Sequence, residues 1–402
     1  MDKIVVIGAG QAGASLVAKL RSLGHTGPIT LIGEENAPPY QRPPLSKKYL
    51  LGEMELERLY LRPESFYAEN AIELLTNDTA IAIDRTDKVV IAGGQQIAYD
   101  QLALCTGSVP RRLPGAIGGE LGGVHVVRTL ADVDTMAPEV REGARALIVG
   151  GGYIGLEAAA VAAKKGLHVT LVELEDRILK RVAARETADY IRAEHARHGV
   201  DIREGTGLDR LTGTPDVTGA ILTDGTELPV DLVIAGIGIT PATELAEMAG
   251  LETENGIKTD AQGRTSDPSI WAAGDCASFP YKGRRIRLES VQNAIDQAEC
   301  VAENMLGAGK DYASVPWFWS DQYDLKLQIA GLHDGYDRVV TRPGADGAAS
   351  FWYFNGNRFL AVDAMNDARA YMIGKRLLEM GKSPDPAVIV DSNVDLKPLL
   401  RA

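Results

Sequence analysis

The stretch IVVIGAGQAG, residues 4–13, decides the fold, because it joins an apolar run to the glycine turn G-x-G-x-x-G. Apolar residues at helical spacing follow over residues 14–23, and a second apolar run occupies residues 29–32. A buried strand, a tight turn, a helix and another buried strand form a β-α-β unit with parallel strands. The first glycine permits the turn, the second lets a pyrophosphate approach the backbone, and the third allows close helix–strand packing. The stretch therefore predicts a dinucleotide-binding unit.

A second copy of this pattern contains ALIVGGGYIG, residues 146–155, so that Gly150 follows Gly8 by 142 residues. We expect its strand, helix and second strand at residues 146–149, 156–165 and 168–172. Each copy has an acid near the end of its second strand, Glu34 or Glu173, which can accept both hydrogen bonds from an adenosine ribose. One such motif is a weak signal, since a glycine-rich surface turn can imitate it. Two copies in the same context predict two separate dinucleotide sites.

Composition excludes several classes of protein. The chain has 402 residues, of which 45% are apolar and 24% charged, as expected for a globular protein of two or three domains. A net charge of −13 argues against nucleic acid as the main partner, because phosphate binding needs a basic surface. No apolar run approaches the roughly 18 residues that a membrane helix needs. The chain leads straight into its first strand without a signal-like segment, so we expect a cytoplasmic protein with no membrane partner.

The three cysteines, Cys105, Cys276 and Cys300, lie far apart in the sequence and form no C-x-x-C pair. Neither a redox disulfide nor a cysteine metal site has support from this spacing. We therefore expect small buried residues in a reducing compartment and no metal site.

Between and after the two glycine units, the patterns predict further elements. Residues 34–66 are irregular and proline-rich, and a loop of that length needs a functional reason. Period-two alternation over residues 72–105 predicts an antiparallel strand set, followed by a strand at residues 101–105. Further strands are expected at 200–203, 217–222, 232–235, 270–273, 325–331, 337–342, 349–354 and 358–363, and further helices at 184–198, 291–306 and 367–380.

The predicted fold class is α/β, with two Rossmann-type dinucleotide-binding domains and a C-terminal α+β domain. The first nucleotide-binding domain comprises residues 1–109 and 236–315, the second is inserted between them at 110–235, and the C-terminal domain spans 316–402. The last boundary rests on composition, because aromatic residues become frequent after Pro316.

The order and spacing of several segments resemble the FAD-dependent NADH:ferredoxin reductase family, a glutathione-reductase-like group that includes putidaredoxin reductase, rhodocoxin reductase and dioxygenase ferredoxin reductases. The similarity covers nearly the whole chain. The segments that carry it are residues 8–13, 42–47, 105–107, 150–157, 236–241, 265–268, 273–277, 289–294 and 316–323. No single segment identifies the family, but their order and spacing together do.

This resemblance implies a set of FAD-binding residues: Gly8, Gly10, Ala12, Gly13, Glu34, Arg42, Lys47, Ala80, Thr106, Gly107, Arg128, Asp275, Val291 and Trp319. Lys47 is expected at the reactive edge of the flavin, where a cation favours the negative charge that arrives with a hydride. The helix that begins at Val291 is expected to direct its positive end at the flavin. From the residues alone, Lys47 could equally be a solvated lysine, Asp275 a turn residue and Trp319 a core aromatic residue.

The resemblance also implies a set of NAD-binding residues: Gly150, Gly152, Tyr153, Ile154, Gly155, Glu173 and Gly236. Glu157 is expected near the nicotinamide, paired with Lys47 as the second catalytic residue, although an acid near a helix N-terminus can simply stabilise the helix dipole. The acids Glu173 and Glu175 favour NADH over NADPH, because carboxylates repel the 2′-phosphate. Arg177 weakens this preference slightly.

The implied activity is transfer of a hydride from NADH to FAD, followed by single-electron transfer to a [2Fe–2S] ferredoxin that serves a cytochrome P450 or a ring-hydroxylating oxygenase. No cysteine lies in residues 40–47, where related sulfur-dependent enzymes carry one, so electrons are expected to leave the flavin directly. Because such ferredoxins are usually acidic, docking needs a local basic patch, and the densest candidate is Lys282, Arg284, Arg285 and Arg287. A solvated run of charges remains the alternative for this patch.

Two other classes of function stay open. A rubredoxin reductase or an NADH oxidase-type flavoenzyme would share these motifs and differ in the electron acceptor. A binding role like that of apoptosis-inducing factor would also share them, although the chain lacks the long C-terminal insert expected there. Monomer and homodimer fit the sequence equally well.

Overall fold

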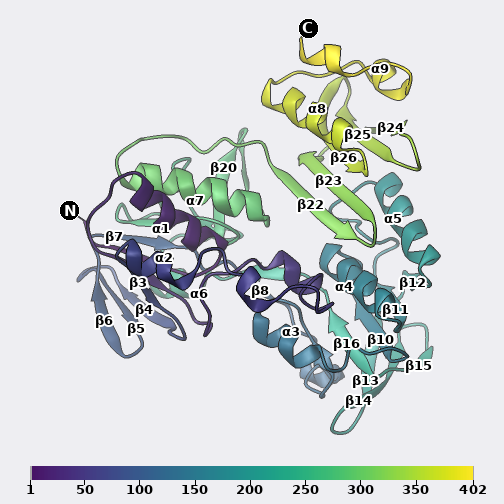
Figure 1. Ribbon diagram of the computed structural model, residues 1–402, viewed down its shortest axis with the longest axis horizontal. Coiled ribbons are helices and arrows are strands. Elements are labelled where there is room, and N and C mark those ends of the chain that lie inside the picture. The colour runs from purple at the N-terminus through teal and green to yellow at the C-terminus, as the bar shows by residue number, and fades with distance from the viewer. Residues whose placement is uncertain (1, 402) are drawn as a thin grey trace. The chain divides into compact units, whose positions relative to one another are not determined.

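The computed structural model describes residues 2–401, and the chain forms two compact units. The first unit comprises Met1–Arg42, Met54–Val109 and Ile239–Ser314, and the second comprises Pro43–Glu53, Pro110–Gly238 and Val315–Ala402. Each unit is built from segments distant in sequence, as the colours of Figure 1 show. The predicted segments 1–109 and 236–315 fall mainly in the first unit, but Pro43–Glu53 belongs to the second.

A five-stranded parallel sheet forms the centre of the first unit. Its strands, in spatial order, are β19 (Ile270–Ala272), β7 (Gln101–Leu104), β1 (Ile4–Ile7), β2 (Ile29–Ile32) and β3 (Ile72–Leu75). Helices α1 (Gln11–Ser22) and α7 (Val291–Met305) lie side by side on one face of this sheet (Figure 1), where Leu16, Val17 and Leu20 pack with Ala298 and Val301. Strands β1 and β19 read as continuous apolar runs because both of their faces are buried, whereas β3, at one end of the strand order, contains exposed Glu73.

The remaining elements of the first unit are short. A three-stranded antiparallel sheet contains β4 (Ala80–Asp84), β5 (Val89–Ala92) and β6 (Gln95–Ala98). A second small sheet contains β18 (Ile257–Lys258), β20 (Ala277–Tyr281) and β21 (Arg284–Ile286). The other elements are α2 (Glu64–Glu69), α6 (Glu244–Met248), β17 (Ile239–Pro241), which pairs with β8 (Ser108–Pro110), and the short helix η2 (Leu56–Arg58).

The second unit repeats the parallel arrangement. Its sheet contains β12 (Asp201–Glu204), β11 (His168–Glu173), β10 (Arg145–Val149), β16 (Leu232–Ala235) and β9 (Val124–His125), in that order. The associated helices are α3 (Leu130–Met136), α4 (Tyr153–Lys164) and α5 (Arg185–Arg197). A small antiparallel sheet contains β13 (Leu208–Gly213), β14 (Val217–Leu222) and β15 (Glu227–Pro229), and the short helices η1 (Pro43–Ser46) and η3 (Gly115–Ile117) complete this part.

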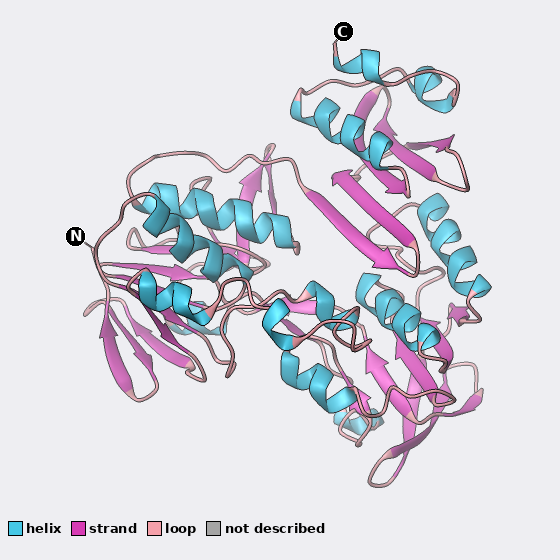
Figure 2. Ribbon diagram, in the orientation of Figure 1, coloured by secondary structure: helices cyan, strands magenta, loops and turns pink. Residues whose placement is uncertain are grey.

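The C-terminal part of the second unit is a five-stranded antiparallel sheet with helices packed on it (Figure 2). In spatial order its strands are β22 (Trp317–Gln322), β23 (Leu325–Gly331), β26 (Arg358–Met365), β25 (Ala349–Asn355) and β24 (Arg338–Pro343). Helix α8 (Ala368–Glu379) packs against this sheet around buried Trp352, Phe359 and Val362, and α9 (Pro386–Val390) and η4 (Lys397–Leu400) follow it. The predicted fold class is confirmed: two parallel nucleotide-binding sheets and a C-terminal α+β part.

Some of the predicted elements were wrong in detail. The segment at residues 72–75 was assigned to the antiparallel set, but β3 pairs parallel to β2, with Ile29 opposite Ile72. Strand β22 was not predicted, because both faces carry aromatic residues and the alternation is lost. Helices α1 and α4 begin at Gln11 and Tyr153, three residues earlier than predicted in each case. Among the described residues, no helix has both the length and the apolar character needed to cross a membrane.

Candidate active site

The first glycine turn lies at the carboxyl end of β1. A Cβ atom at Gly8, whose φ is +108°, would lie 2.1 Å from the carbonyl oxygen of Cys105, and one at Gly13 would lie 2.0 Å from that of Gly8. Both positions therefore require glycine, because any Cβ atom would collide with a backbone carbonyl oxygen. A Cβ at Gly10 would meet no atom of the described chain within 4 Å. The second glycine thus faces open space, as expected where a ligand approaches the backbone.

The helix that follows is open to an anion at its N-terminus. Among the described residues, no side chain caps α1 at Gly10, and the first turn of α1 contains no acidic residue. Its first backbone N–H groups, including that of Ala12, therefore have no intrahelical acceptor. Together with the helix dipole, these groups form a site suited to the pyrophosphate of a dinucleotide.

The second glycine turn has the same construction in the second unit. A Cβ at Gly150 would lie 2.4 Å from the carbonyl oxygen of Gly236, and one at Gly155 would lie 2.1 Å from that of Gly150. A Cβ at Gly152 would meet no described atom within 4 Å. The first turn of α4 has neither a side-chain cap nor an acid within the described chain. Gly236, which was predicted to bind NAD, packs against the backbone of this turn at Gly155.

The two acids, by contrast, do not occupy matching positions. Strand pairing places Ile7 opposite Ile32 in the first unit and Val149 opposite Val172 in the second. The next residue is Glu173 in the second unit but Gly33 in the first, so that Glu34 comes one position later. Both acids lie near the end of the second strand, as expected, but they are offset from each other by one residue.

The residue after the first glycine explains this difference. In the second unit, Glu173 Oε2 accepts a hydrogen bond of 2.7 Å from Gly151 N–H. The equivalent residue of the first unit is Ala9, and a Cβ at Gly33 would lie 2.5 Å from the Ala9 methyl carbon. The methyl group occupies the space that a side chain at residue 33 would need, and Glu34 is exposed instead.

Several other predicted FAD residues gather at the carboxyl ends of β7 and β19, where open α/β sheets bind ligands. Ser108 Oγ donates a 3.2 Å hydrogen bond to Asp275 Oδ2, and Thr106 Oγ1 donates one of 2.7 Å to the carbonyl of Ala242. The carbonyl of Gly107 accepts from the N–H of Ala242 at 3.0 Å. These hydrogen bonds fix Thr106, Gly107 and Asp275 at the carboxyl ends of the strands.

Arg42 is held by a residue that sequence reasoning missed. Its Nη2 lies 2.6 Å from Glu35 Oε1, and its Nη1 donates a 3.0 Å hydrogen bond to Tyr40 Oη. The Tyr40 hydroxyl in turn donates to Glu35 Oε2 at 2.5 Å. This triad orders the proline-rich loop before it enters the second unit, and Asp275 is close enough to act on the Arg42 charge.

Helix α7 begins at Val291, as predicted. Ser290 Oγ accepts a hydrogen bond of 3.2 Å from Asn293 N–H, and the first turn has no acidic residue among those described. Gln297, further along α7, accepts from Gly274 N–H at 2.9 Å, one residue before Asp275. Helix α7 is thus hydrogen-bonded to the residue that precedes Asp275. Ala80 begins β4 in the same unit, and its predicted adenine contact remains a prediction.

Lys47 and Glu157 form the predicted pair within the second unit. Lys47 Nζ lies 2.6 Å from Glu157 Oε2, and Ser46 Oγ donates to the same oxygen at 2.9 Å. Ser320 Oγ donates to the other oxygen, Oε1, at 2.6 Å. Glu157 is only 3% exposed, so these side chains, and not the helix dipole alone, satisfy its charge. Its catalytic role remains a prediction.

The aromatic and apolar residues near this pair differ in exposure. The Tyr153 ring packs against Phe318 with centroids 4.9 Å apart, and burial raises the pKa of its hydroxyl. The adjacent Ile154 is 47% exposed at the start of α4. Trp319 lies on β22, with its ring 5.6 Å from that of Trp317. Side chains of the predicted site are thus present on both α4 and β22 in one unit.

Arg128 lies just before α3 in the second unit. Its backbone N–H donates to Asp132 at 3.1 Å, within the turn where Thr129 and Asp132 form a capping box. This cap fixes the residue at the start of the helix. The predicted contact of Arg128 with FAD is not tested by these bonds.

The cations after Glu173 are engaged with other groups. Arg177 donates to the carbonyl of Ala183 at 2.9 Å, and Lys180 lies 2.8 Å from Glu175 and 3.0 Å from Asp176. Both positive charges are therefore partly satisfied within the loop. This arrangement supports the expected repulsion of a 2′-phosphate.

No sulfur relay is available within the described residues. All three cysteines are free and buried, and burial raises the pKa of Cys105, which disfavours its reactive thiolate form. No cluster of His, Cys, Asp or Glu suited to a metal ion occurs in residues 2–401.

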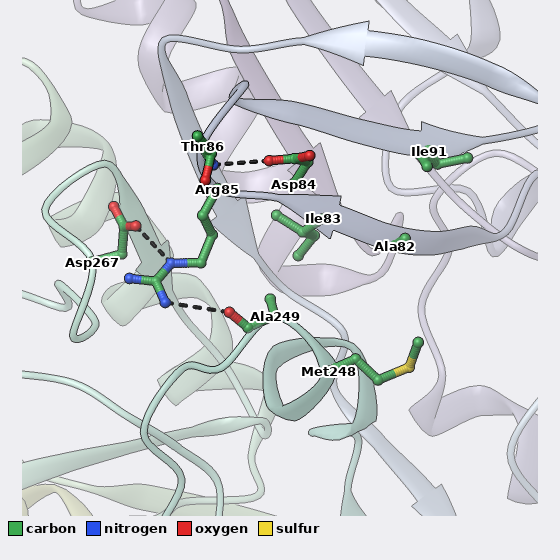
Figure 3. Close-up of a pocket in the computed structure, with 9 residues that line it drawn as sticks. All are labelled: Ala82, Ile83, Asp84, Arg85, Thr86, Ile91, Met248, Ala249 and Asp267. Carbon is green, nitrogen blue, oxygen red and sulfur yellow. Dashed lines mark hydrogen bonds and ion pairs between the residues drawn. The ribbon is translucent and has the colours of Figure 1, made fainter.

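A hollow in the first unit lies between β4 and α6 (Figure 3), with a cavity volume of about 640 Å³. Its main polar groups are satisfied by one another, since Arg85 pairs with Asp267 at 2.8 Å and donates to the carbonyl of Ala249 at 3.3 Å. We assign it no ligand.

Comparison with known proteins identifies the class. Residues 2–298 match the family model of pyridine nucleotide-disulphide oxidoreductases, and residues 317–400 match that of the reductase C-terminal domain. The chain therefore belongs to the pyridine nucleotide-disulphide oxidoreductase family. This family of oxidoreductases binds FAD and NAD(P)H, and the two open glycine turns described above fit that pair of cofactors.

Individual relatives narrow the similarity. The chain is 44% identical to a ferredoxin–NAD(P)+ reductase of Sphingomonas sp, over 96% of this chain and 94% of that protein. It is 42% identical to rhodocoxin reductase of Rhodococcus erythropolis, over 98% and 93%. Its fold matches the solved covalent putidaredoxin reductase–putidaredoxin complex with a TM-score of 0.96 and 40% identity, covering 100% of this chain and 98% of that one. The expected family resemblance is confirmed.

Proposed function

We propose that this protein is an NADH-dependent ferredoxin reductase whose [2Fe–2S] ferredoxin serves a cytochrome P450 or a ring-hydroxylating oxygenase. FAD, when bound, would accept a hydride from NADH and release electrons one at a time. The observation that carries the proposal is the combination of two open nucleotide turns with three buried, free cysteines. Without a sulfur relay in the described chain, electrons pass to an external carrier, as the names of the similar reductases suggest.

The residues of the chain have separate tasks in this function. Residues 8–13 hold the pyrophosphate of the resident FAD, and Asp275 and Arg42 bind its central part. Residues 150–155 hold the pyrophosphate of NADH, and Glu173 binds its adenosine ribose. Hydride transfer needs no side-chain base, so the protein contributes position and electrostatics. The Lys47 ammonium supplies positive charge, and Glu157 fixes the position of that ammonium.

NADH is the proposed electron donor because negative charge surrounds the ribose position. Glu173 ends β11 and Glu175 lies in the loop after it, while Lys180 is neutralised by two acids. A 2′-phosphate placed there would meet carboxylates, while the guanidinium of Arg177 already binds a backbone carbonyl. For the compartment, we propose the cytoplasm, since free buried cysteines are typical of a reducing environment.

Steady-state kinetics test this function directly. Purified protein saturated with FAD should show a flavin spectrum and reduce cytochrome c with NADH only when a [2Fe–2S] ferredoxin is present, with a much lower kcat/KM for NADPH. Transfer to rubredoxin alone would replace the proposed acceptor. Rapid reduction of oxygen would indicate an oxidase, and slow NADH turnover with a persistent reduced complex would indicate a binding role. A protein that takes up no FAD would contradict the proposal altogether.

A further inference from the structure

A chain of hydrogen bonds leads from Glu157 into the C-terminal sheet. Ser320 Oγ donates to Glu157 Oε1 at 2.6 Å, and Gln322 Nε2 donates to Ser320 Oγ at 3.2 Å. Gln322 Oε1 lies 2.8 Å from His195 Nε2, and Tyr323 Oη lies 3.1 Å from His195 Nδ1. The chain joins α4, β22 and α5, and all of its members belong to the second unit.

Burial makes each of these bonds costly to lose. Ser320 is 1% exposed, Gln322 and Glu157 are each 3% exposed, and His195 is fully buried. Ser320 and Gln322 are two residues apart on β22, so strand alternation directs both side chains to the same face. Bulk solvent does not reach these side chains, so a group that loses its partner destabilises the fold.

The hydrogen bonds all point in one direction. Burial lowers the pKa of His195 to about 4, so the ring is neutral at pH 7 and carries one N–H. Gln322 Oε1 can only accept, so the proton lies on Nε2 and is donated to that oxygen, and Nδ1 then accepts from the Tyr323 hydroxyl. The Gln322 amide then presents N–H to Ser320, whose single hydroxyl hydrogen remains available for Glu157.

The opposite arrangement would remove a donor from Glu157. If the Gln322 amide were turned round, its oxygen would face Ser320 and accept the hydroxyl hydrogen. Glu157 Oε1 would then be without this bond and free to compete with Oε2 for Lys47 Nζ. Within the described chain, Lys47 Nζ also donates to the Pro43 carbonyl, but at a long 3.4 Å. The position of the ammonium therefore depends on the orientation of the carboxylate.

We propose that Ser320, Gln322 and His195 are positioning residues that hold the Glu157 carboxylate so that its Oε2 fixes Lys47 for hydride transfer. This inference rests on the proposed function only for the hydride-transfer step. The geometry of the chain of bonds is independent of which protein finally accepts the electrons.

The first test is the rate of flavin reduction by NADH, measured by anaerobic stopped-flow absorbance. Ser320→Ala should slow this step about tenfold, the loss expected for one hydrogen bond to a charged group. Ser320→Thr keeps the hydroxyl and should restore the rate to within about twofold. Gln322→Glu keeps the volume but offers only acceptors, so it should take the Ser320 hydrogen and slow the step as Ser320→Ala does.

A matched control separates positioning from general loss of stability. Thr187, also buried in the second unit, donates a 2.7 Å hydrogen bond to Asp363 outside this chain of bonds. Thr187→Val should lower the melting temperature without changing the hydride-transfer rate. If it slowed the step as much as Ser320→Ala does, the proposal would be overturned. Should Ser320→Ala not fold, the comparison of Ser320→Thr with Gln322→Glu decides the question.

A second readout does not depend on turnover. Nitrogen-15 spectra of the FAD-loaded protein, without NADH, should show His195 as the Nε2–H tautomer and a protected Lys47 ammonium signal. Ser320→Ala and Gln322→Glu should each increase proton exchange at Lys47 Nζ, while Thr187→Val should not. Unchanged Lys47 signals in both variants would overturn the proposal. Failure to reduce any ferredoxin, with these results as expected, would contradict the proposed function and leave this inference standing.

Discussion

At the scale of single residues, the two glycine turns differ in which of two neighbouring positions has a side chain: the strand end in the second unit and the turn in the first. The second unit pairs a glycine at residue 151 with the carboxylate of Glu173, while the first pairs Ala9 with Gly33. Only one side chain fits at each position, so a methyl group in the turn excludes an acid at the strand end. This difference makes the turns unequal although their glycine patterns are the same.

Gly151→Ala should therefore weaken NADH binding selectively. The new Cβ would lie 2.7 Å from Ile178 Cγ2 and 3.1 Å from Glu173 Oε2, which would displace the carboxylate from Gly151 N–H. We expect the dissociation constants for NADH and NAD+, which share the adenosine ribose, to rise about tenfold, the effect of one bond to a charged group, with no change in FAD content. Titration calorimetry with NAD+ and a flavin absorbance measurement check both parts. The control Ala9→Gly should leave NAD+ affinity unchanged. An equal loss of NAD+ affinity in both variants would contradict a specific role for the Gly151–Glu173 hydrogen bond.

Glu175→Arg should shift nucleotide preference toward NADPH. The substitution removes a carboxylate, adds a guanidinium that can bind a phosphate, and frees Lys180 from its 2.8 Å partner. We expect the ratio of kcat/KM for NADPH to that for NADH to rise about tenfold or more. Kinetics with a saturating artificial acceptor measure this ratio. Glu186→Arg on α5 provides a control of equal charge change, and the same rise in that variant would show a general effect of net charge.

At the scale of elements, the apolar runs predicted the central strands well, since β2, β14 and β16 have the predicted bounds. The first turns of α1 and α4 were missed because those residues are selected for backbone N–H groups facing a ligand and not for apolar spacing. Strand β3 was assigned to the wrong sheet because pairing partners depend on tertiary structure. Lys47 and Glu157 were predicted only through family motifs, and Ser320, Gln322 and His195 carry no local signal of their mutual contacts.

A buried acid joins α5 to the C-terminal sheet and should make stability depend on pH. Asp363 accepts hydrogen bonds from Thr187 at 2.7 Å and from the Tyr353 hydroxyl, and burial raises its pKa to about 6. Because the folded-state pKa exceeds the unfolded value, its stabilising contribution is fully present below about pH 4 and is lost as pH rises through about 6. The difference across this window is about 3 kcal/mol, from about 1.4 kcal/mol for each pKa unit.

Comparison with Asp363→Asn isolates this effect. His195, whose pKa is lowered to about 4, changes stability in the opposite direction over a similar range, but it does so in both proteins. The melting temperature of wild type minus that of Asp363→Asn should therefore fall between pH 4 and pH 7. Differential scanning fluorimetry over this range measures the difference. A constant difference would show that Asp363 does not titrate in the folded protein.

At the scale of the whole molecule, an acidic protein with net charge −13 must receive an electron carrier that is usually acidic as well. The predicted basic patch lies on and around β21 in the first unit, but two of its four members have structural tasks. Arg285 donates to the carbonyl of Ser278 at 2.6 Å, and Arg287 donates to that of Asp275 at 3.1 Å. Changing either would disturb the fold next to the predicted FAD site. Arg284, which is exposed on β21, is the cleaner probe of docking.

Arg284→Glu should slow reduction of a ferredoxin while sparing reduction of ferricyanide. Reversal of one charge at the rim of an interface acts mainly on association, so we expect a loss of about three- to tenfold in kcat/KM for ferredoxin at low ionic strength. The loss should shrink at about 0.5 M salt, where screening shortens the range of the interaction. Arg210→Glu, an exposed change on β13 in the other unit, controls for net charge and should have little effect. Equal loss with ferricyanide, or equal loss in the control, would show that this patch does not receive the ferredoxin.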